Sequence, residues 1–285
     1  MKTVSSLFFV ISLLLLSSLS SCTQDDEVDS PNPDPSCRIT RTYSTHPFQW
    51  PDSTLYQYDD QDRLLQSTWF YKGKEKGRGN YEYNSQGQLA KQTIKEMNAD
   101  DQRQYTIEIT EVITFEYNSK GQLAKYNSVK RGPSTISPNG YYQTSSESSC
   151  EYDTAGNRIR VTTTYDGKYS FVNEYVYQDG NCIKFTNNPG SQNEIVYTYE
   201  FDLNREDKLK SFNEAYNLLG QTPNKNLVTR NTITYPELNY NNLITTQDYT
   251  YEFDNQNNEV KSQVNFATSQ NYKYSYTRSK KYECR

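Results

Sequence analysis

A β-hairpin unit recurs along this chain, and most copies place two aromatic residues before a turn and a leucine or isoleucine after it. The clearest copies occupy residues 56–64, 81–89, 115–123 and 150–159, and looser copies begin at Tyr175, Tyr199 and Tyr251. The second aromatic residues are 25, 34, 35, 25, 24 and 52 residues apart, so the last spacing is about twice the shortest. Recurrence at this period predicts an architecture built by repeating one supersecondary unit.

The turn of each unit has the composition of a tight hairpin connection. Asn or Asp starts the turn and Gly follows within it, which supplies the positive φ that such turns need. We expect Gly87 and Gly121 to adopt positive φ for this reason. The flanking segments alternate with period two, so that Ile113, Phe115 and Tyr117 share one face of a strand. We expect this aromatic face to be buried.

Tyrosine supplies most of the apolar surface of the chain. Of the 285 residues 27 are Tyr, while hydrophobic residues of all kinds make up 33%, so a large aliphatic core is excluded. Tyrosine favours strands and has a polar tip that tolerates water. The sequence therefore predicts an all-β protein, an antiparallel meander of about sixteen strands, strongly curled or closed like a barrel.

One segment departs from the strand pattern. Leu209, Phe212, Tyr216 and Leu219 recur at intervals of three and four residues, and Gly220 follows directly. This spacing and stop signal predict a short amphipathic helix near 207–218, packed on the tyrosine face of the sheet. The polar strand faces carry Arg, Glu, Lys and Thr where a bilayer span would need an apolar band, so we expect no span by these strands.

The amino terminus has the features of an export signal. Lys2 precedes an apolar run at residues 7–19, which is too short to cross a bilayer. Leu19-Ser20-Ser21-Cys22 resembles the lipobox of bacterial lipoproteins, which implies a signal peptide at 1–21 and acylation, with palmitate among the acyl chains, at Cys22. The alternative is an ordinary secretory signal with a chance cysteine.

Residues 22–36 have too little apolar surface to fold and are expected to be a disordered tether before a single domain at 37–285. The acidic cluster after Cys22 resembles the export tag of Bacteroidetes surface lipoproteins. That resemblance implies the outer membrane, with the protein lipid-anchored and exposed at the cell surface. A solvated spacer without an address signal is the alternative.

The repeat also resembles known families. The Tyr-x-Tyr-Asp-x-x-Gly-x-Leu pattern is similar to the YD repeats of Rhs and teneurin proteins, which form β-sheet shells. The lipobox, the aromatic hairpins and a late interrupting segment at 202–230 together resemble an uncharacterised family of Bacteroidetes surface lipoproteins with a porin-like β fold. This likeness covers about residues 37–278 and implies a barrel shape without known catalytic residues.

Several kinds of chemistry lack the residues that they require. His46 is the only histidine, which removes histidine-dependent triads and zinc sites with paired histidines. No phosphate-binding glycine loop occurs, and an isoelectric point near 5.2 argues against nucleic acid. Asp59, Asp60 and Asp62 could bind calcium or contribute to glycoside hydrolysis, but they occupy a turn where Asp is favoured for its own hydrogen bonds. We therefore expect no catalytic residue, metal or cofactor.

Aromatic residues outside the repeated pairs are the candidates for contact with a ligand. These candidates are Trp50, Trp69, Phe70, Tyr71, Tyr141 and Tyr142. We expect a non-enzymatic surface protein that binds a glycan or a protein partner and meets the membrane through its lipid alone. A structural spacer or shell component is the first alternative, and a carboxylate-based glycan hydrolase is the second.

Four cysteines follow Cys22, an even number in an exported chain. In a meander, Cys150 and Cys182 lie three strand steps apart, roughly 14 Å, whereas the Cα atoms of a disulfide lie within about 7 Å. We expect that pair to be unbonded. Cys37 begins the first strand and Cys284 ends the last, so they become neighbours, able to form a disulfide, if the sheet closes.

Overall fold

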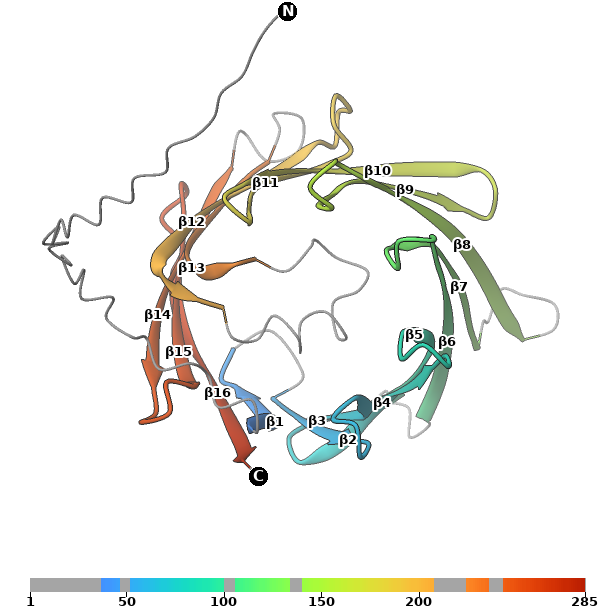
Figure 1. The fold of residues 1–285 in the computed structure, drawn as a ribbon, viewed down its shortest axis with the longest axis horizontal. Helices are drawn as coiled ribbons and strands as arrows, with labels where there is room; N and C mark the ends of the chain where they lie inside the picture. The colour runs from blue at the N-terminus through green and yellow to red at the C-terminus, as the bar shows by residue number, and fades with distance from the viewer. Residues whose placement is uncertain are drawn as a thin grey trace, which may run out of the picture. The chain divides into compact units, whose positions relative to one another are not determined.

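The protein is seen in a computed structural model that describes residues 37–46, 52–99, 106–133, 140–207, 224–235 and 243–284. Sixteen strands form one closed antiparallel barrel in which each strand pairs with its neighbours in the chain (Figure 1). The strands are β1 Cys37–Ser44, β2 Ser53–Tyr58, β3 Leu64–Tyr71, β4 Lys74–Tyr83, β5 Leu89–Ala99, β6 Thr106–Tyr117, β7 Leu123–Pro133, β8 Tyr141–Tyr152, β9 Arg158–Tyr165, β10 Tyr169–Gln178, β11 Asn181–Asn187, β12 Ile195–Glu206, β13 Asn226–Thr234, β14 Ile244–Phe253, β15 Glu259–Thr268 and β16 Lys273–Cys284.

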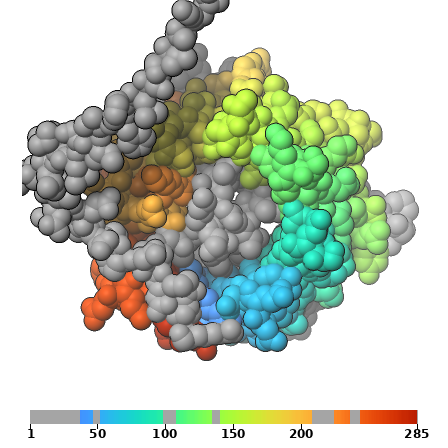
Figure 2. Space-filling view, viewed as in Figure 1, coloured from blue at the N-terminus to red at the C-terminus, as the bar shows by residue number. Residues whose placement is uncertain are grey.

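The predicted all-β meander of about sixteen strands is confirmed, and the choice between a curled and a closed sheet is settled in favour of closure. In the space-filling view the strands follow one another around the rim in chain order (Figure 2). The helix expected near 207–218 falls almost wholly on residues outside the described ranges. Within those ranges, no helix is long and apolar enough to cross a membrane.

The first and last strands close the barrel. β1 pairs with β16 from Cys37 opposite Cys284 to Ser44 opposite Arg278, and the two strands lie side by side in Figure 1. Cys37 and Cys284, expected to be neighbours in a closed sheet, are joined by a disulfide that spans 247 positions of sequence. The two ends of the barrel domain are therefore linked covalently.

Antiparallel strands in chain order place alternate turns at opposite ends of the barrel. One end, here called the Asx end, holds the connections β2–β3, β4–β5, β6–β7, β8–β9 and β14–β15, together with the disulfide. The opposite end, here called the far end, holds connections such as β3–β4, β9–β10 and β15–β16. The turn geometry that recurs from one repeat to the next lies at the Asx end.

The turn at Asn84 shows that geometry. The backbone N–H of Gly87 donates to the Asn84 carbonyl at 3.0 Å, and the Asn84 side-chain oxygen accepts from the N–H groups of Gln86 and Gln88 at 3.0 and 2.9 Å. The same backbone bond recurs at Asp59, Asn118, Asp153 and Asp254. These bonds explain why Asn or Asp is the first residue of each of these turns.

The repeated turn needs one residue with positive φ. That position is Gly87 (φ 78°), Gly121 (78°) and Gly156 (89°), as expected for the first two, while Asp62 (59°) and Asn257 (61°) occupy it in the other hairpins. The connection is thus a type I turn followed by one left-handed residue, rather than an Asn-Gly pair with two positive φ angles. The pairing of β4 with β5 shifts by one residue next to the turn, from Glu82 opposite Lys91 to Tyr83 opposite Leu89. This shift is a β-bulge.

Replacing Gly121 with Val should lower the free energy of unfolding by about 1 kcal/mol or more, because a β-branched residue is strained at positive φ. Gly121→Asn is the matched control, since Asn257 adopts the same conformation in its own turn. Urea unfolding of both variants measures the effect. Equal stability of Gly121→Val and the parent would contradict this turn assignment.

Tyrosine hydroxyl groups connect each hairpin to the preceding one. Six tyrosines donate their hydroxyl to a backbone carbonyl near the start of the preceding strand, and four of the six are the second aromatic residue of a unit. The pairs are Tyr58 to Ile39, Tyr83 to Leu64, Tyr117 to Leu89, Tyr152 to Leu123, Tyr251 to Val228 and Tyr282 to Glu259, at 2.6 to 3.0 Å. Burial raises the pKa of Tyr117 to about 12. Because a buried hydroxyl needs a partner, these carbonyls satisfy the hydroxyl groups of the six tyrosines.

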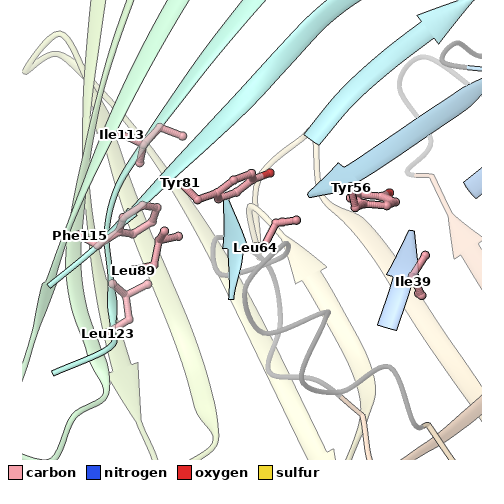
Figure 3. Close-up of a cluster of buried hydrophobic side chains, with 8 residues drawn as sticks. All are labelled: Ile39, Tyr56, Leu64, Tyr81, Leu89, Ile113, Phe115 and Leu123. Carbon is pink, nitrogen blue, oxygen red and sulfur yellow. The ribbon is translucent and has the colours of Figure 1, made fainter. Parts of the chain in front are cut away.

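The aromatic face is buried, and in a closed barrel that face lines the interior. Side chains from successive hairpins pack together there as a hydrophobic cluster (Figure 3). Its buried members are Ile39, Tyr56, Leu64, Tyr81, Leu89, Ile113, Phe115 and Leu123. The expected burial of the repeated aromatic pairs holds for this part of the barrel.

The outer face carries charged pairs between neighbouring strands. These pairs are Lys91–Glu82, Lys95–Glu108, Lys125–Glu147, Arg160–Glu174, Arg230–Glu200, Arg230–Asp248 and Lys261–Glu252. Their side chains are largely exposed to water, so these pairs add little to the stability of the fold. Their main consequence is a polar outer wall.

The position after the turn is not always apolar. Tyr152 pairs with Arg158, so Arg158 and not Ile159 occupies the place that Leu89 holds opposite Tyr83. Arg158 is buried, whereas Ile159 is 36% exposed. The sequence comparison that put Ile159 in the leucine position was wrong by one residue, because Arg158 stands two residues after Gly156, as Leu89 does after Gly87.

The two remaining cysteines are free thiols, as expected for a pair three strands apart. Cys182 is fully buried and Cys150 is half-buried, and both belong to a small cluster around Val161 and Tyr175. Burial raises the pKa of the Cys182 thiol to about 11.

A thiol of this kind reacts slowly because the thiolate is the reactive form. We expect maleimide at pH 7 to leave Cys182 unmodified in the folded protein and to modify both Cys150 and Cys182 in urea. Mass spectrometry of peptides counts the modified sites. Rapid labelling of Cys182 without urea would show that this part of the barrel opens readily.

Candidate ligand-contact surface

The far end of the barrel gathers the aromatic residues that the sequence singled out. Trp69, Phe70 and Tyr71 lie at the end of β3, and Tyr141 and Tyr142 lie at the start of β8. Trp50 falls outside the described residues. The two groups belong to one end of the barrel but to strands that are not neighbours.

Two of these rings fill space beside a glycine. Trp69 pairs with Gly77, and Tyr142 pairs with Gly132. A β-carbon built on Gly77 would lie 2.6 Å from the Trp69 ring, and one on Gly132 would lie 2.8 Å from the Tyr142 ring. Trp69 and Tyr142 thus each pack over the small residue on the adjacent strand.

The other predicted rings differ in exposure. Phe70 lies against the guanidinium of Arg41, whose central carbon is 5.6 Å from the ring centre. Tyr71 is 37% exposed and Tyr141 is 64% exposed. Only the last two of these candidates thus offer a large exposed area among the described residues.

The sequence interpretation missed three exposed rings in the β9–β10 hairpin. Tyr165, Tyr169 and Phe171, here called the ring platform, are 45%, 68% and 44% exposed. They continue the inward register of Val161 and Tyr175, since Thr163 pairs with Phe171 and Tyr165 pairs with Tyr169. The signal that could have found them is their place around Asp166-Gly167, a strong hairpin turn.

A second aromatic group lies beside the β1–β16 closure. Phe266 stacks on Tyr274 with ring centres 4.5 Å apart, and His46 contacts Tyr276 edge to face at 4.4 Å. His46 also shares a hydrogen bond with the Tyr274 hydroxyl at 3.0 Å. Burial, followed by the positive charge of Arg278, lowers the pKa of His46. The imidazole is therefore half-buried among tyrosines.

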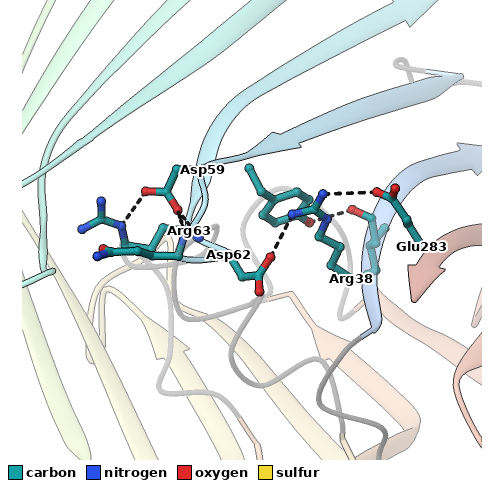
Figure 4. A network of polar contacts seen from close by, with 8 residues as sticks. Arg38, Asp59, Asp62, Arg63 and Glu283 are labelled. Atoms are coloured by element: carbon teal, nitrogen blue, oxygen red, sulfur yellow. Dashed lines mark hydrogen bonds and ion pairs between the residues drawn. The ribbon is translucent and has the colours of Figure 1, made fainter. Parts of the chain in front are cut away.

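The acidic residues of the first turn are engaged in structural contacts (Figure 4). Asp59 accepts from the backbone N–H groups of Gln61 and Arg63 and pairs with the Arg63 guanidinium at 2.7 Å. These contacts lower the pKa of Asp59 against the opposing effect of desolvation, which is the largest single contribution. Asp62 pairs with Arg38 at 2.8 Å, and Arg38 also pairs with Glu283.

These contacts favour the turn role of Asp59 and Asp62 over a metal or catalytic role. Asp60 is exposed in the same turn. Among the described residues, no group of three or more potential metal ligands comes together.

A buried ion pair lies on the inner face near the Asx end. Lys280 and Glu259 are 2.6 Å apart, and their side chains are 14% and 8% exposed. Burial lowers the pKa of Lys280, while the negative charges of Glu259 and Asp207 act in the opposite direction. Glu259 pairs with Phe253 and so occupies the position that leucine holds in other units.

No family model and no curated protein matches the chain. Among solved structures it is similar to a porin-like protein from Bacteroides uniformis ATCC 8492, with 15% identity, 86% of this chain and 98% of that chain covered, and a TM-score of 0.43. It is also similar to a porin-like protein from Bacteroides vulgatus ATCC 8482, with 12% identity, 86% of this chain and 98% of that chain covered, and a TM-score of 0.42. A third similar structure is that of TcdB2-TccC3-Cdc42, with 10% identity, 78% of this chain and 15% of that chain covered, and a TM-score of 0.21.

Proposed function

We propose that this chain is a lipid-anchored, surface-exposed protein of the outer membrane that binds an extracellular glycan or protein through the far end of its barrel and catalyses no reaction. The observation that carries this proposal is the exposure of aromatic side chains at that end. Tyr141 and Tyr169 are 64% and 68% exposed, and tyrosine gives contact area at a low cost in side-chain entropy.

The polar outer wall supports a barrel surrounded by water. A barrel embedded in lipid needs an outward apolar band, whereas this wall carries cross-strand charged pairs such as Lys95–Glu108 and Arg160–Glu174. This barrel therefore has charged side chains on its outer face and packed aromatic side chains on its inner face, whereas a membrane channel has an apolar outer face and a polar interior. Attachment to the membrane then falls to the proposed acyl chains on Cys22.

The position of the first strand suggests how the barrel is presented. Cys37 lies at the Asx end, and the fifteen residues from Cys22 to Cys37 span at most about 50 Å when fully extended. The tether therefore starts from the end opposite to the exposed rings. An anchor at the Asx end favours presentation of the far end to the surroundings of the cell.

Anchoring is tested by replacing Cys22 with Ala in cells fed a clickable fatty acid. We expect the variant to lose the label and to leave the membrane fraction, while intact cells with the parent protein are stained by antibody against the barrel. Unchanged labelling of the variant, or staining only after the cells are opened, would contradict the anchor or the surface address.

Binding is tested with the mature chain carrying Cys22→Ser, offered to a glycan array and to proteins of the growth medium. We expect at least one ligand whose binding falls when Tyr141 and Tyr169 are both replaced by Ser. Ser85→Tyr, at the Asx end, is the control and should not alter binding. Ligand binding that is insensitive to far-end variants would place the binding surface elsewhere.

A further inference from the structure

We infer that the ring platform of Tyr165, Tyr169 and Phe171 binds a neutral oligosaccharide, with pyranose rings lying against the aromatic faces. This inference rests on the proposed binding function and names its ligand class and contact residues. The argument uses the exposure of the rings, the rigidity of their hairpin and the charges and backbone pairing around them.

Exposure at inward positions is the first observation. At the Asx end, aromatic residues in the inward register are buried, as Tyr56 (6%), Tyr81 (4%) and Phe115 (7%) show. In the same register on β9 and β10 the three platform rings are 44% to 68% exposed. Their exposure leaves about half of each ring available to a ligand at one end of the barrel.

The hairpin that carries the platform is held in place before any ligand arrives. Tyr165 and Phe171 contact each other edge to face, with ring centres 5.5 Å apart and planes at 87°. The Asp166 carboxylate accepts from the backbone N–H of Ser145 at 2.7 Å and from its hydroxyl at 3.2 Å, which ties the turn to β8. A preformed surface loses little conformational entropy when it binds.

The chemistry around the rings selects the ligand class. The turn contributes one acid, Asp166, and one base, Lys168, and Thr163 adds a hydroxyl group on the same face as the rings, beside the hydroxyls of Tyr165 and Tyr169 themselves. A pyranose offers C–H groups on its faces for the rings and hydroxyl groups on its rim for these polar side chains. Aromatic faces with a few polar groups are the usual composition of a small-ligand site.

The other ligand classes lack a matching feature here. An extended peptide that adds a strand needs a free sheet edge, and every strand of the closed barrel has a paired neighbour on each side, so none offers a full-length free edge. A nucleic acid needs a basic surface, whereas the chain has a net charge of -5 and the platform turn is balanced in charge. A neutral saccharide requires neither feature.

The test measures binding of neutral polysaccharides and hexasaccharides of glucose, xylose and mannose to the mature chain carrying Cys22→Ser, by calorimetry. The informative variant is Tyr169→Ser with Phe171→Ser. Its matched control is Val176→Ser, which lies on the same strand, is 49% exposed and points to the outer face. Circular dichroism verifies that each variant keeps its strands.

We expect one of these saccharides to bind the parent, the double variant to bind it about tenfold more weakly or worse, and the control to match the parent. Saccharide binding that survives the double variant would overturn the platform and leave the proposed function standing. Binding of a protein but of no saccharide would overturn the ligand class alone. No binding of either kind would overturn both proposals.

Discussion

Replacing both Cys37 and Cys284 with Ser is expected to lower the free energy of unfolding by about 5 kcal/mol, because the disulfide closes a loop of nearly the whole domain. The bond spans 247 positions, so the unfolded chain gains much conformational freedom when it is removed. It also reinforces the closing strand, since β1 pairs with β2 over Arg41–Tyr43 and with β16 along its length.

The measurement is urea unfolding of the parent and the double serine variant, each with and without reductant. The parent should weaken in reductant, while the variant should be insensitive to it. Cys150→Ser is the control, because Cys150 is a free thiol and its variant should keep the response of the parent to reductant. A parent that unfolds at the same urea concentration in both conditions would show that strand pairing alone holds the closure.

The repeat made most of the fold predictable because its information is local. An Asx residue, a glycine at the left-handed position and alternating aromatic residues each act within a few residues of sequence, so hairpins such as 81–89 could be read directly. The prediction of a closed sheet used one long-range observation, which is that Cys37 and Cys284 lie at the two ends of the domain. The sequence could state that pairing as a condition, and the barrel meets it.

Features set by neighbouring strands were harder to predict. Trp69 and Tyr142 pack over glycines that lie on another strand, and nothing in their own segments shows this. The rings of Tyr169 and Phe171 share the inward register of buried tyrosines such as Tyr81, and yet they are 68% and 44% exposed. The alternation of faces can thus be read from one strand, whereas the exposure of a side chain is a property of the assembled sheet.

The ion pair between Lys280 and Glu259 provides the second large expected effect. Replacing Lys280 with Met should cost about 3–5 kcal/mol, because it leaves the carboxylate of Glu259 buried without its partner. The pair is 2.6 Å apart and both side chains are largely buried, so water cannot easily substitute for the missing charge. Glu259→Leu alone should be destabilising for the converse reason.

The double variant Lys280→Met with Glu259→Leu should recover most of that loss. Leucine is the residue that Leu64, Leu89 and Leu123 provide at the equivalent position after a turn, so the repeat itself indicates that an apolar side chain fits there. Buried ion pairs can often be replaced by apolar residues of similar size at little cost in stability. The expected coupling between the two sites is therefore large and favourable to the double variant.

Lys261 and Glu252 provide the comparison on the outer face. They are also 2.6 Å apart, but their side chains are 42% and 64% exposed, so Lys261→Met should cost less than about 1 kcal/mol. Urea unfolding of the two single variants, the double variant and this control completes the cycle. If the double variant loses as much stability as the two single variants together, the two residues do not stabilise each other. Other groups would then stabilise the charges of Glu259 and Lys280, and the prediction would be contradicted.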